Sequence, residues 1–284
     1  MIGPSATPSA VPRLPPASVA GLGLRPGLNP DVLALDGLSV DSAAMQQVQP
    51  APQAVATADD VAVLLLVDMA PGQRLWGWSR IVLGQRPLQG VAGLRMAKAL
   101  GSGHQGGFGL RPSASRQGLF ALFDGEAAAD AFIERSAIVA HYRQRASESL
   151  LVKLRATSCR GAWSGTRMAA TASAPASGPV AALTRASIRP SRAWPFWRQS
   201  PASEAALAGA AGCQLAVGLG EAPVLRQATF SVWDDQAAMD AYARSGAHLQ
   251  AIRGATAGNW FSESMFVRLV PLALHGQWQG RRYG

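Results

Sequence analysis

The stretch RQATFSVWDDQAAMDAYARSGAHLQAIR, residues 226–253, decides the fold because the chain contains a second version of it. The earlier version is RQGLFALFDGEAAADAFIERSAIVAHYR, residues 116–143, and the two align without a gap at a spacing of 110 residues. Each begins with a strand-like apolar run and continues with apolar residues at helical spacing. A strand followed by an amphipathic helix, present twice, indicates a duplicated unit.

The repeat extends in both directions from this stretch. Residues 147–165 match residues 262–280 at a spacing of 115, and residues 61–101 match residues 180–220 at a spacing of 119. The spacing changes only between these blocks, as expected when loops gain or lose residues in a duplicated domain. The sequence therefore predicts two related units of about 105 residues each, a size that can bury a core.

Each unit has the element order β-α-β-β-α-β, which is that of a ferredoxin-like fold. A ferredoxin-like sheet covers one face with helices and leaves the other face apolar, so two such faces can bury each other. We therefore predict an α+β protein in which two fused ferredoxin-like repeats form a pseudo-dimeric α+β barrel. The expected strands are residues 61–67, 94–101, 117–123, 150–157, 180–187, 214–220, 227–233 and 265–270, and the expected helices are residues 74–85, 126–145, 192–209 and 235–253.

Composition sets the expected domain boundaries. Residues 1–58 are rich in Pro, Ala, Gly and Ser and lack periodicity, which predicts a disordered N-terminal extension. The first repeat is expected over residues 59–167 and the second over residues 179–284, joined by a linker at residues 168–178.

The charge of the chain is basic and suits an anionic partner. Lys and Arg number 26 against 17 Asp and Glu, giving a formal net charge of +9. Phospholipid head groups, nucleic acid or a carboxylated cofactor would all match this balance, and a solvated arginine-rich surface is the simplest alternative. The RNA-recognition fold needs a glycine and then a stacking aromatic near the start of its third strand, and residues 116–120 and 226–230 lack this pattern. We therefore expect no nucleic-acid partner.

Other features bear on where the chain works. Cys159 and Cys213 fit no disulfide framework and no metal-ligand spacing, which favours a reducing compartment. No secretory signal is evident, and the longest aliphatic run, residues 61–67, is far shorter than the roughly 20 residues that span a bilayer. The segment Trp194-Pro-Phe-Trp197 lies on an expected helix, where core packing is the default and membrane contact the alternative.

The sequence lacks the usual signatures of hydrolytic and nucleotide chemistry. It contains no HExxH, no GxSxG and no paired-cysteine zinc pattern. The loop at residues 101–107 is rich in glycine but lacks the Lys-Ser/Thr of a phosphate-binding loop, so we expect a β-β loop there.

His248 is the first candidate site residue. On one continuous helix it would share a stripe with Ala241, Tyr242 and Leu249 and would face the sheet. The first repeat has Ile138 at this position. Because an unpartnered buried polar group costs about 1–3 kcal/mol, the imidazole should be compensated by a core hydrogen bond or by a ligand.

Arg185 is the second candidate. It replaces Leu66 of the first repeat and lies on the strand expected over residues 180–187. An arginine beside an inward histidine would suit an anionic planar cofactor, with the guanidinium pairing a carboxylate or facing the reaction side. The alternative is a strand-end arginine that reaches solvent.

Several separated motifs resemble one known family. They are GPVAALTRASIRP (178–190), GLGEAP (218–223), QATFSVW (227–233), SGAHLQAIR (245–253), RGAWSG (160–165) and GSGHQGGF (101–108). Together they resemble spheroidene monooxygenase, a bacterial family of acyclic-carotenoid ketolases, over about residues 61–282. The long N-terminal extension and His104 depart from the family pattern.

The resemblance implies an oxygen-dependent enzyme that oxidises the carbon beside the methoxylated end of spheroidene-type carotenoids to a ketone. It implies haem as cofactor, with His248 carried over as axial ligand of the iron and Arg185 as a catalytic and cofactor-binding residue. Electrons would come from an external donor, such as a donor protein. The alternative is a non-catalytic α+β barrel that carries haem or an apolar ligand.

A carotenoid is too apolar to diffuse through water. A basic enzyme would therefore collect its acyclic carotenoid substrate at an anionic membrane surface. We expect a cytoplasmic protein that is peripheral at the inner or photosynthetic membrane.

Overall fold

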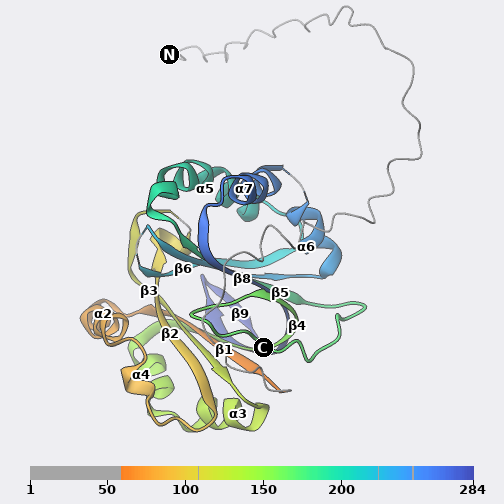
Figure 1. The fold of residues 1–284 in the computed structure, drawn as a ribbon. Helices are drawn as coiled ribbons and strands as arrows, with labels where there is room; N and C mark the ends of the chain where they lie inside the picture. Colours follow the sequence, from red (N-terminus) through yellow and green to blue (C-terminus); the bar gives the residue numbers. More distant parts are fainter. Residues whose placement is uncertain (1–58, 108, 223, 245) are drawn as a thin grey trace, which may run out of the picture. The chain divides into compact units, whose positions relative to one another are not determined.

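Two halves of the chain follow the same order of strands and helices (Figure 1). The structure is a computed structural model that describes residues 59–284 except 108, 223 and 245, and it leaves undescribed the side chains of residues 199–201, 203, 208, 247, 248, 251, 252 and 256. The extension predicted to be disordered, residues 1–58, lies outside the described residues.

The predicted order β-α-β-β-α-β is confirmed in each half. The first half contains β1 (Val61–Met69), η2 (Pro71–Gln73), α2 (Arg74–Leu83), η3 (Arg86–Leu88), β2 (Leu94–Gly103), η4 (His104–Gly106), β3 (Pro112–Phe123), α3 (Glu126–Arg135), α4 (Ala137–Arg145) and β4 (Ala146–Gly161). The second contains β5 (Val180–Ile188), η5 (Pro190–Arg192), α5 (Ala193–Ala208), β6 (Cys213–Ala222), β7 (Arg226–Trp233), α6 (Gln236–Ala243), α7 (Gly246–Ala257), β8 (Phe261–Trp278) and β9 (Arg281–Tyr283). None of the helices in the described part is long and apolar enough to cross a membrane.

The second helix of each half is broken, which corrects the prediction of single helices over residues 126–145 and 235–253. Between α3 and α4 the backbone of Ser136 is extended, with φ −72° and ψ 122°. Between α6 and α7 the chain leaves the helix after Ala243, and Gly246 takes a positive φ of 54°. The predicted stripe of side chains required one continuous helix, so it does not extend across this break to His248.

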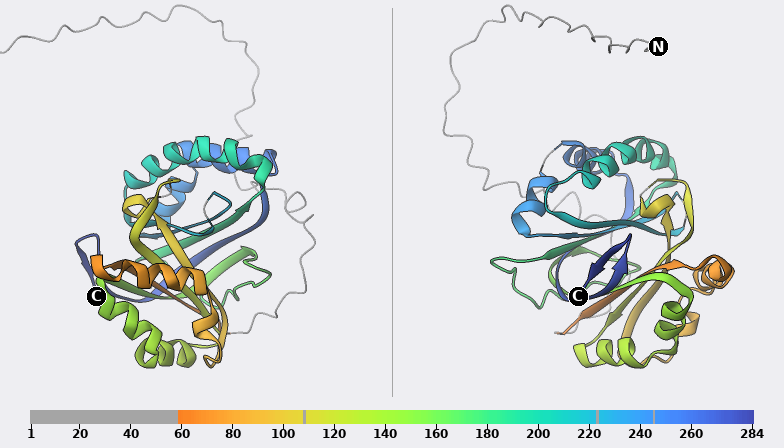
Figure 2. Two further views of the ribbon diagram at one scale, coloured as in Figure 1. Left: turned by 90° about the vertical axis from the view of Figure 1, so that its left-hand side faces the viewer. Right: turned by 180° about the vertical axis from the view of Figure 1, so that it is seen from behind.

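The strands close into a barrel, as predicted. Within the described residues they form one sheet in the order β4-β1-β3-β2-β6-β7-β5-β8-β9, and a further pairing of β4 with β8 closes it. The β4–β8 ladder is long, running from Leu150–Gly276 to Gly161–Met265, whereas β2 and β6 pair only at Gly101–Gly220 and Ser102–Leu219. The two halves therefore join through one long seam and one short seam, with their helices outside (Figure 2).

Alternation of side chains along the strands gives two apolar layers. On β1, Ala62, Leu64 and Leu66 belong to the cluster inside the barrel, whereas Val63 and Leu65 belong to the cluster under the helices. All of β1 from Val61 to Val67 is at most 1 % exposed. Because successive residues point to opposite faces of a strand, a run that is apolar throughout fills both layers.

Two hairpins each place a tryptophan inside the barrel. Trp163 follows β4 and Trp278 ends β8, and both are members of the interior cluster with at most 1 % of their surface exposed. Glycine permits each chain to cross its neighbouring strand closely. A Cβ at Gly161 (φ 78°) would lie 2.0 Å from the Ser264 carbonyl oxygen, and one at Gly276 (φ 128°) 2.1 Å from that of Ser149.

We predict that Gly161→Ala lowers the free energy of unfolding by at least about 2 kcal/mol, because it adds a clash with β8 to the cost of a positive φ. Gly165→Ala is the matched control, since Gly165 has a φ of 74° but no atom within 4 Å of its Cβ position. It should cost about 1 kcal/mol. Denaturant midpoints measure both, and equal losses in the two variants would contradict the close approach of β4 to β8.

Candidate functional site

Arg185 lies inside the barrel, in the middle of β5. It shares its strand face with Ala181 and Leu183, which belong to the interior cluster, and only 2 % of its surface is exposed. Its side chain therefore does not reach solvent, and the alternative of a strand-end arginine is wrong. The helices α5 and α7 cover the opposite face of this sheet (Figure 1).

Two carboxylates hold the guanidinium of Arg185. Its Nη2 donates to Oε2 of Glu221 on β6 at 2.9 Å, and its Nη1 donates to Oε2 of Glu263 on β8. The intervening β7 carries Ala228 in register with Arg185, and this small side chain leaves the arginine room to reach β6. The indole of Trp163 lies 5.7 Å from the guanidinium carbon, within the range of a cation–π contact.

A lysine and the Trp163 hairpin complete this buried cluster. Lys98 Nζ lies 3.0 Å from Glu221 Oε1 and donates to Ser164 Oγ at 2.8 Å. Trp163 Nε1 donates to Glu221 Oε2 at 3.0 Å. Two cations thus face two carboxylates, so the charge of Arg185 is already matched within the barrel. The Nε of Arg185 is buried without a hydrogen-bond partner among the described residues.

Glu221 is ionised in this setting. Burial raises the pKa of its carboxyl group. Arg185 and Lys98 lower this pKa by a larger amount, through their hydrogen bonds and their positive charges, so it lies below its ordinary value. Glu221 is therefore charged at neutral pH, and the ion pairs of Arg185 with Glu221 and Glu263 join β5 to β6 and β8.

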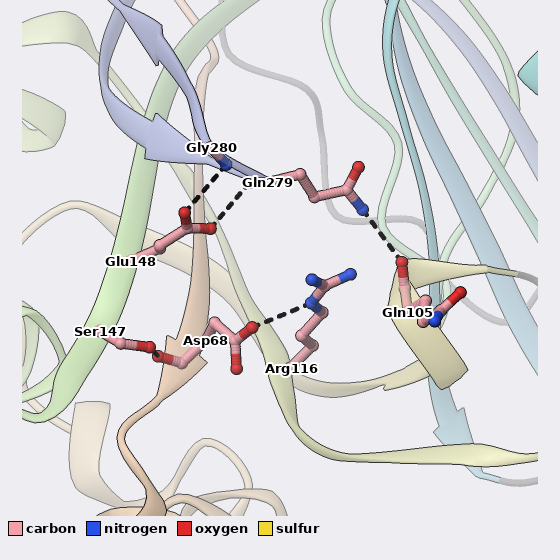
Figure 3. A pocket seen from close by; sticks show the side chains of 7 residues that line it. All are labelled: Asp68, Gln105, Arg116, Ser147, Glu148, Gln279 and Gly280. Carbon is pink, nitrogen blue, oxygen red and sulfur yellow. Dashed lines mark hydrogen bonds and ion pairs between the residues drawn. The ribbon is translucent and has the colours of Figure 1, made fainter.

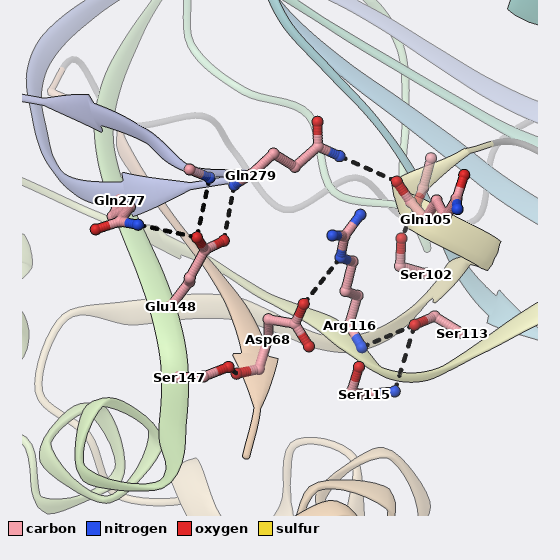
Figure 4. Close-up of polar contacts among 12 residues, drawn as sticks. Asp68, Ser102, Gln105, Ser113, Ser115, Arg116, Ser147, Glu148, Gln277 and Gln279 are labelled. Atoms are coloured by element: carbon pink, nitrogen blue, oxygen red, sulfur yellow. Dashed lines mark hydrogen bonds and ion pairs between the residues drawn. The ribbon is translucent and has the colours of Figure 1, made fainter. Parts of the chain in front are cut away.

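An open, polar pocket of about 640 Å³ lies beside Glu148, whereas Leu66, the counterpart of Arg185, belongs to the apolar interior. Its lining residues are Asp68, Gln105, Arg116, Ser147, Glu148, Gln279 and Gly280 (Figure 3). Glu148, the counterpart of Glu263, accepts hydrogen bonds from the backbone N–H groups of Gln279 at 2.7 Å and Gly280 at 2.9 Å. Arg116 Nε donates to Asp68 Oδ2 at 3.0 Å (Figure 4). Because these side chains bind one another and are polar, this pocket does not suit an apolar ligand.

A second pocket, of about 470 Å³, lies beside the short β2–β6 seam. The loop of η4, the start of β6, the end of α5 and the β8–β9 hairpin line it, and Leu207, Leu215, Trp278 and Tyr283 supply apolar surface. Burial raises the pKa of Cys213 and of Tyr283, so both are neutral at pH 7. Leu215 belongs to the barrel interior and Cys213 packs under the helices, so this pocket reaches both faces of β6.

The layer between the sheet and the helices differs most between the two halves. In the first half one row across four paired strands is Leu151, Leu65, Leu119 and Ala99. At the same positions the second half has Phe266, Thr184, Thr229 and Gly218. Thr184 and Thr229 are partly exposed, whereas the three leucines are at most 3 % exposed. Three of these four positions therefore carry smaller side chains in the second half, and the fourth carries the larger Phe266.

His248 lies in α7, the helix that covers this layer, and its side chain is outside the described part of the structure. Its counterpart Ile138 in α4 packs against the helix-facing cluster of the first half. The structure does not bring Arg185 and His248 together, because the Arg185 side chain lies on the barrel side of the sheet and α7 covers the other side.

Sequence reasoning missed the partners of Arg185. Glu263 had a signal, since the Ser-Glu-Ser that contains it is repeated at residues 147–149. Trp163 is also repeated, as Trp278. Glu221 and Lys98 had none, because their counterparts Ser102 and Val217 are not acidic or basic.

We predict that Glu221→Gln lowers the free energy of unfolding by roughly 2–4 kcal/mol at pH 7, because it leaves buried cations with one counter-charge fewer. The lowered pKa of Glu221 means that its stabilisation is present above the ordinary value of 4.5 and is lost as pH falls through the folded value. The free energies of unfolding of wild type and variant should therefore become equal as the pH falls, which acid denaturation curves measure. Glu126→Gln, at a half-exposed carboxylate paired with Lys153, should cost about 1 kcal/mol or less, and an equal loss in both variants would contradict the buried cluster.

Comparisons with known proteins give the family. A scan against protein-family models found no match. The spheroidene monooxygenase of Rubrivivax gelatinosus is 60 % identical over 233 residues, which cover 82 % of this chain and 90 % of the relative. That of Rhodobacter capsulatus is 34 % identical over 210 residues, covering 72 % of this chain and 87 % of the relative.

The solved structures that this chain matches have low identity and TM-scores below 0.5. An anthrone oxidase-like protein is 14 % identical with a TM-score of 0.29, covering 80 % of this chain and 98 % of its own. The aldoxime dehydratase OxdRE is 11 % identical with a TM-score of 0.46, covering 77 % of this chain and 81 % of its own. These likenesses carry no functional argument. On the identity to its curated relatives, the chain belongs to the spheroidene monooxygenase family.

Proposed function

We propose that this chain uses molecular oxygen to oxidise an acyclic carotenoid of the spheroidene type to a ketone, in carotenoid biosynthesis. Family membership carries this proposal, because the match to a relative named spheroidene monooxygenase runs through both halves of the barrel. An electron donor outside the chain would supply the reducing equivalents. A carotenoid partner places the working enzyme at a membrane surface, since such a substrate dissolves in the bilayer.

We further propose that haem is the cofactor and that it occupies the helix-facing layer of the second half. What supports this placement is that threonine and glycine replace the leucines and alanine of the first half across the paired strands. Each buried leucine contributes about 1.5–3 kcal/mol, so two absent leucines leave roughly 3–6 kcal/mol of packing to be supplied by something else. Phe266 remains in the row as an apolar wall.

His248 is the residue that we propose as axial ligand. The equivalent Ile138 packs against the helix-facing cluster of the first half, so an imidazole at this position of α7 would face the corresponding layer of the second half. Haem held there would supply the oxygen-activating chemistry that the side chains of the chain lack. The chain's own part is to orient this ring from α7 and to exclude water with α5, α7 and the sheet. Thr184 and Thr229 place hydroxyl groups on the same face as hydrogen-bonding groups.

Arg185 has a positioning role in this proposal. Its side chain is on the far side of β5 from the layer, and its ion pairs with Glu221 and Glu263 tie β5 to β6 and β8. Together with β7, which lies between β5 and β6, these three strands form the floor of the proposed cofactor site. The arginine thus acts through the strands that it joins and not by contact with haem.

We predict that His248→Ala abolishes the Soret band that appears when the purified chain is titrated with haem. His141→Ala is the matched control, because His141 is exposed on α4 of the first half and should leave the titration unchanged. In a host that makes spheroidene-type carotenoids, wild type and His141→Ala should yield a keto product by absorbance and mass, and His248→Ala should not. Haem binding without any keto product would identify a non-catalytic carrier instead.

We predict that Thr184→Leu with Thr229→Leu weakens haem binding at least tenfold while stabilising the haem-free chain, because the leucines of the first half would fill the layer. Titration and thermal unfolding measure the two effects. The reciprocal change Leu65→Thr should lower the melting temperature and leave haem affinity unchanged. Unaltered haem affinity in the double variant would place the cofactor elsewhere.

A further inference from the structure

One stripe of α2 presents large apolar side chains to solvent. Leu75 is 87 % exposed, Val82 84 % and Trp78 39 %. These residues are spaced i, i+3 and i+7, so they lie on one side of the helix. The helix rests on the sheet through its other side, where Gly77 is buried and Trp76 packs against the first-half cluster. We call Leu75, Trp78 and Val82 the α2 face.

The surroundings of the α2 face are basic. Arg74 begins α2 and Arg86 begins η3, which follows it, and both arginines are exposed. The segment from Arg74 to Arg86 contains no Asp and no Glu. An apolar stripe between arginines on a helix that lies along the protein surface matches the interface of an anionic bilayer, where apolar groups enter the acyl boundary and cations meet head groups.

The second half repeats this feature at an equivalent position. Trp194, the counterpart of Leu75, is 74 % exposed in the first turn of α5. Arg192 and Arg198 beside it are exposed. The helices α2 and α5 lie on the same side of the molecule, which faces the viewer in the left view of Figure 2. The first turn of α5 thus also presents an exposed tryptophan between arginines.

We propose that this side of the molecule docks on an anionic lipid bilayer, with the α2 face inserted and Trp194 as a second contact. A second copy of the chain fits less well, because a symmetric contact through this face would set arginines against arginines. The formal net charge of +9 likewise favours an anionic bilayer over a second copy of the chain. The purpose of this docking, the collection of an apolar substrate, rests on the proposed function. The docking itself does not, because lipid binding is measured without haem or carotenoid.

The test is flotation of the full chain with vesicles of phosphatidylcholine alone or of phosphatidylcholine with phosphatidylglycerol. Wild type should float with the anionic vesicles and should dissociate from them at high salt. Leu75→Ser with Val82→Ser should weaken the partition at least about tenfold, since it removes two apolar side chains from the contact. Arg74→Gln with Arg86→Gln should weaken binding to anionic vesicles specifically. Leu272→Ser is the control, because Leu272 is 38 % exposed on β8, outside the docking face.

Three results would overturn the docking surface: wild type that does not float, an α2 double variant that floats as wild type does, or a control that weakens equally. A dimer of wild type in sedimentation that the α2 double variant dissociates would assign the face to a second copy. The double variant should keep its activity on carotenoid dispersed in detergent. Vesicle binding by a chain that makes no keto product would contradict the proposed function and leave the docking surface intact.

Discussion

Every strand of the barrel must pack its side chains into two apolar layers, one inside the barrel and one under the helices. The rest of the structure depends on this constraint. Inward side chains of both halves interdigitate inside the closed sheet, and outward side chains meet the helices. A change on one face of a strand is therefore felt by one layer only. This separation allows a polar cluster to be built inside the barrel while the helix-facing layer is altered independently.

The two halves use this freedom differently. The first half fills its helix-facing layer with leucine, valine and phenylalanine and leaves an open polar pocket at its end of the barrel. The second half does the reverse. It places Arg185, Glu221 and Glu263 inside the barrel, where Lys98 of the first half joins them, and it carries threonine and glycine at three positions of the layer under α5 and α7. The ion pairs of Arg185 hold β5, β6 and β8 together on the barrel side of the strands that carry this threonine and glycine.

The sequence repeat was sufficient to predict the barrel, because it identified the elements twice and set their order. It could not show the breaks at Ser136 and before Gly246, since apolar spacing continues across them. It also could not place Arg185. The counterpart strand from Val61 to Val67 is apolar on both faces, so its pattern does not reveal which face position 66 occupies. Only the register, which puts Arg185 with Ala181 and Leu183, separates it from the side that α7 covers. The hairpin tryptophans were visible as a repeat, but burial inside a barrel depends on closure between β4 and β8, which lies beyond local pattern.

The most direct measurement of the central claim is a crystal structure of the chain grown with haem. The account predicts planar density between the β5–β6–β7 sheet and α7, with the iron bonded to the imidazole of His248. Haem in either of the two pockets, or a His248 ring turned away from the sheet toward solvent with the layer unoccupied, would contradict it.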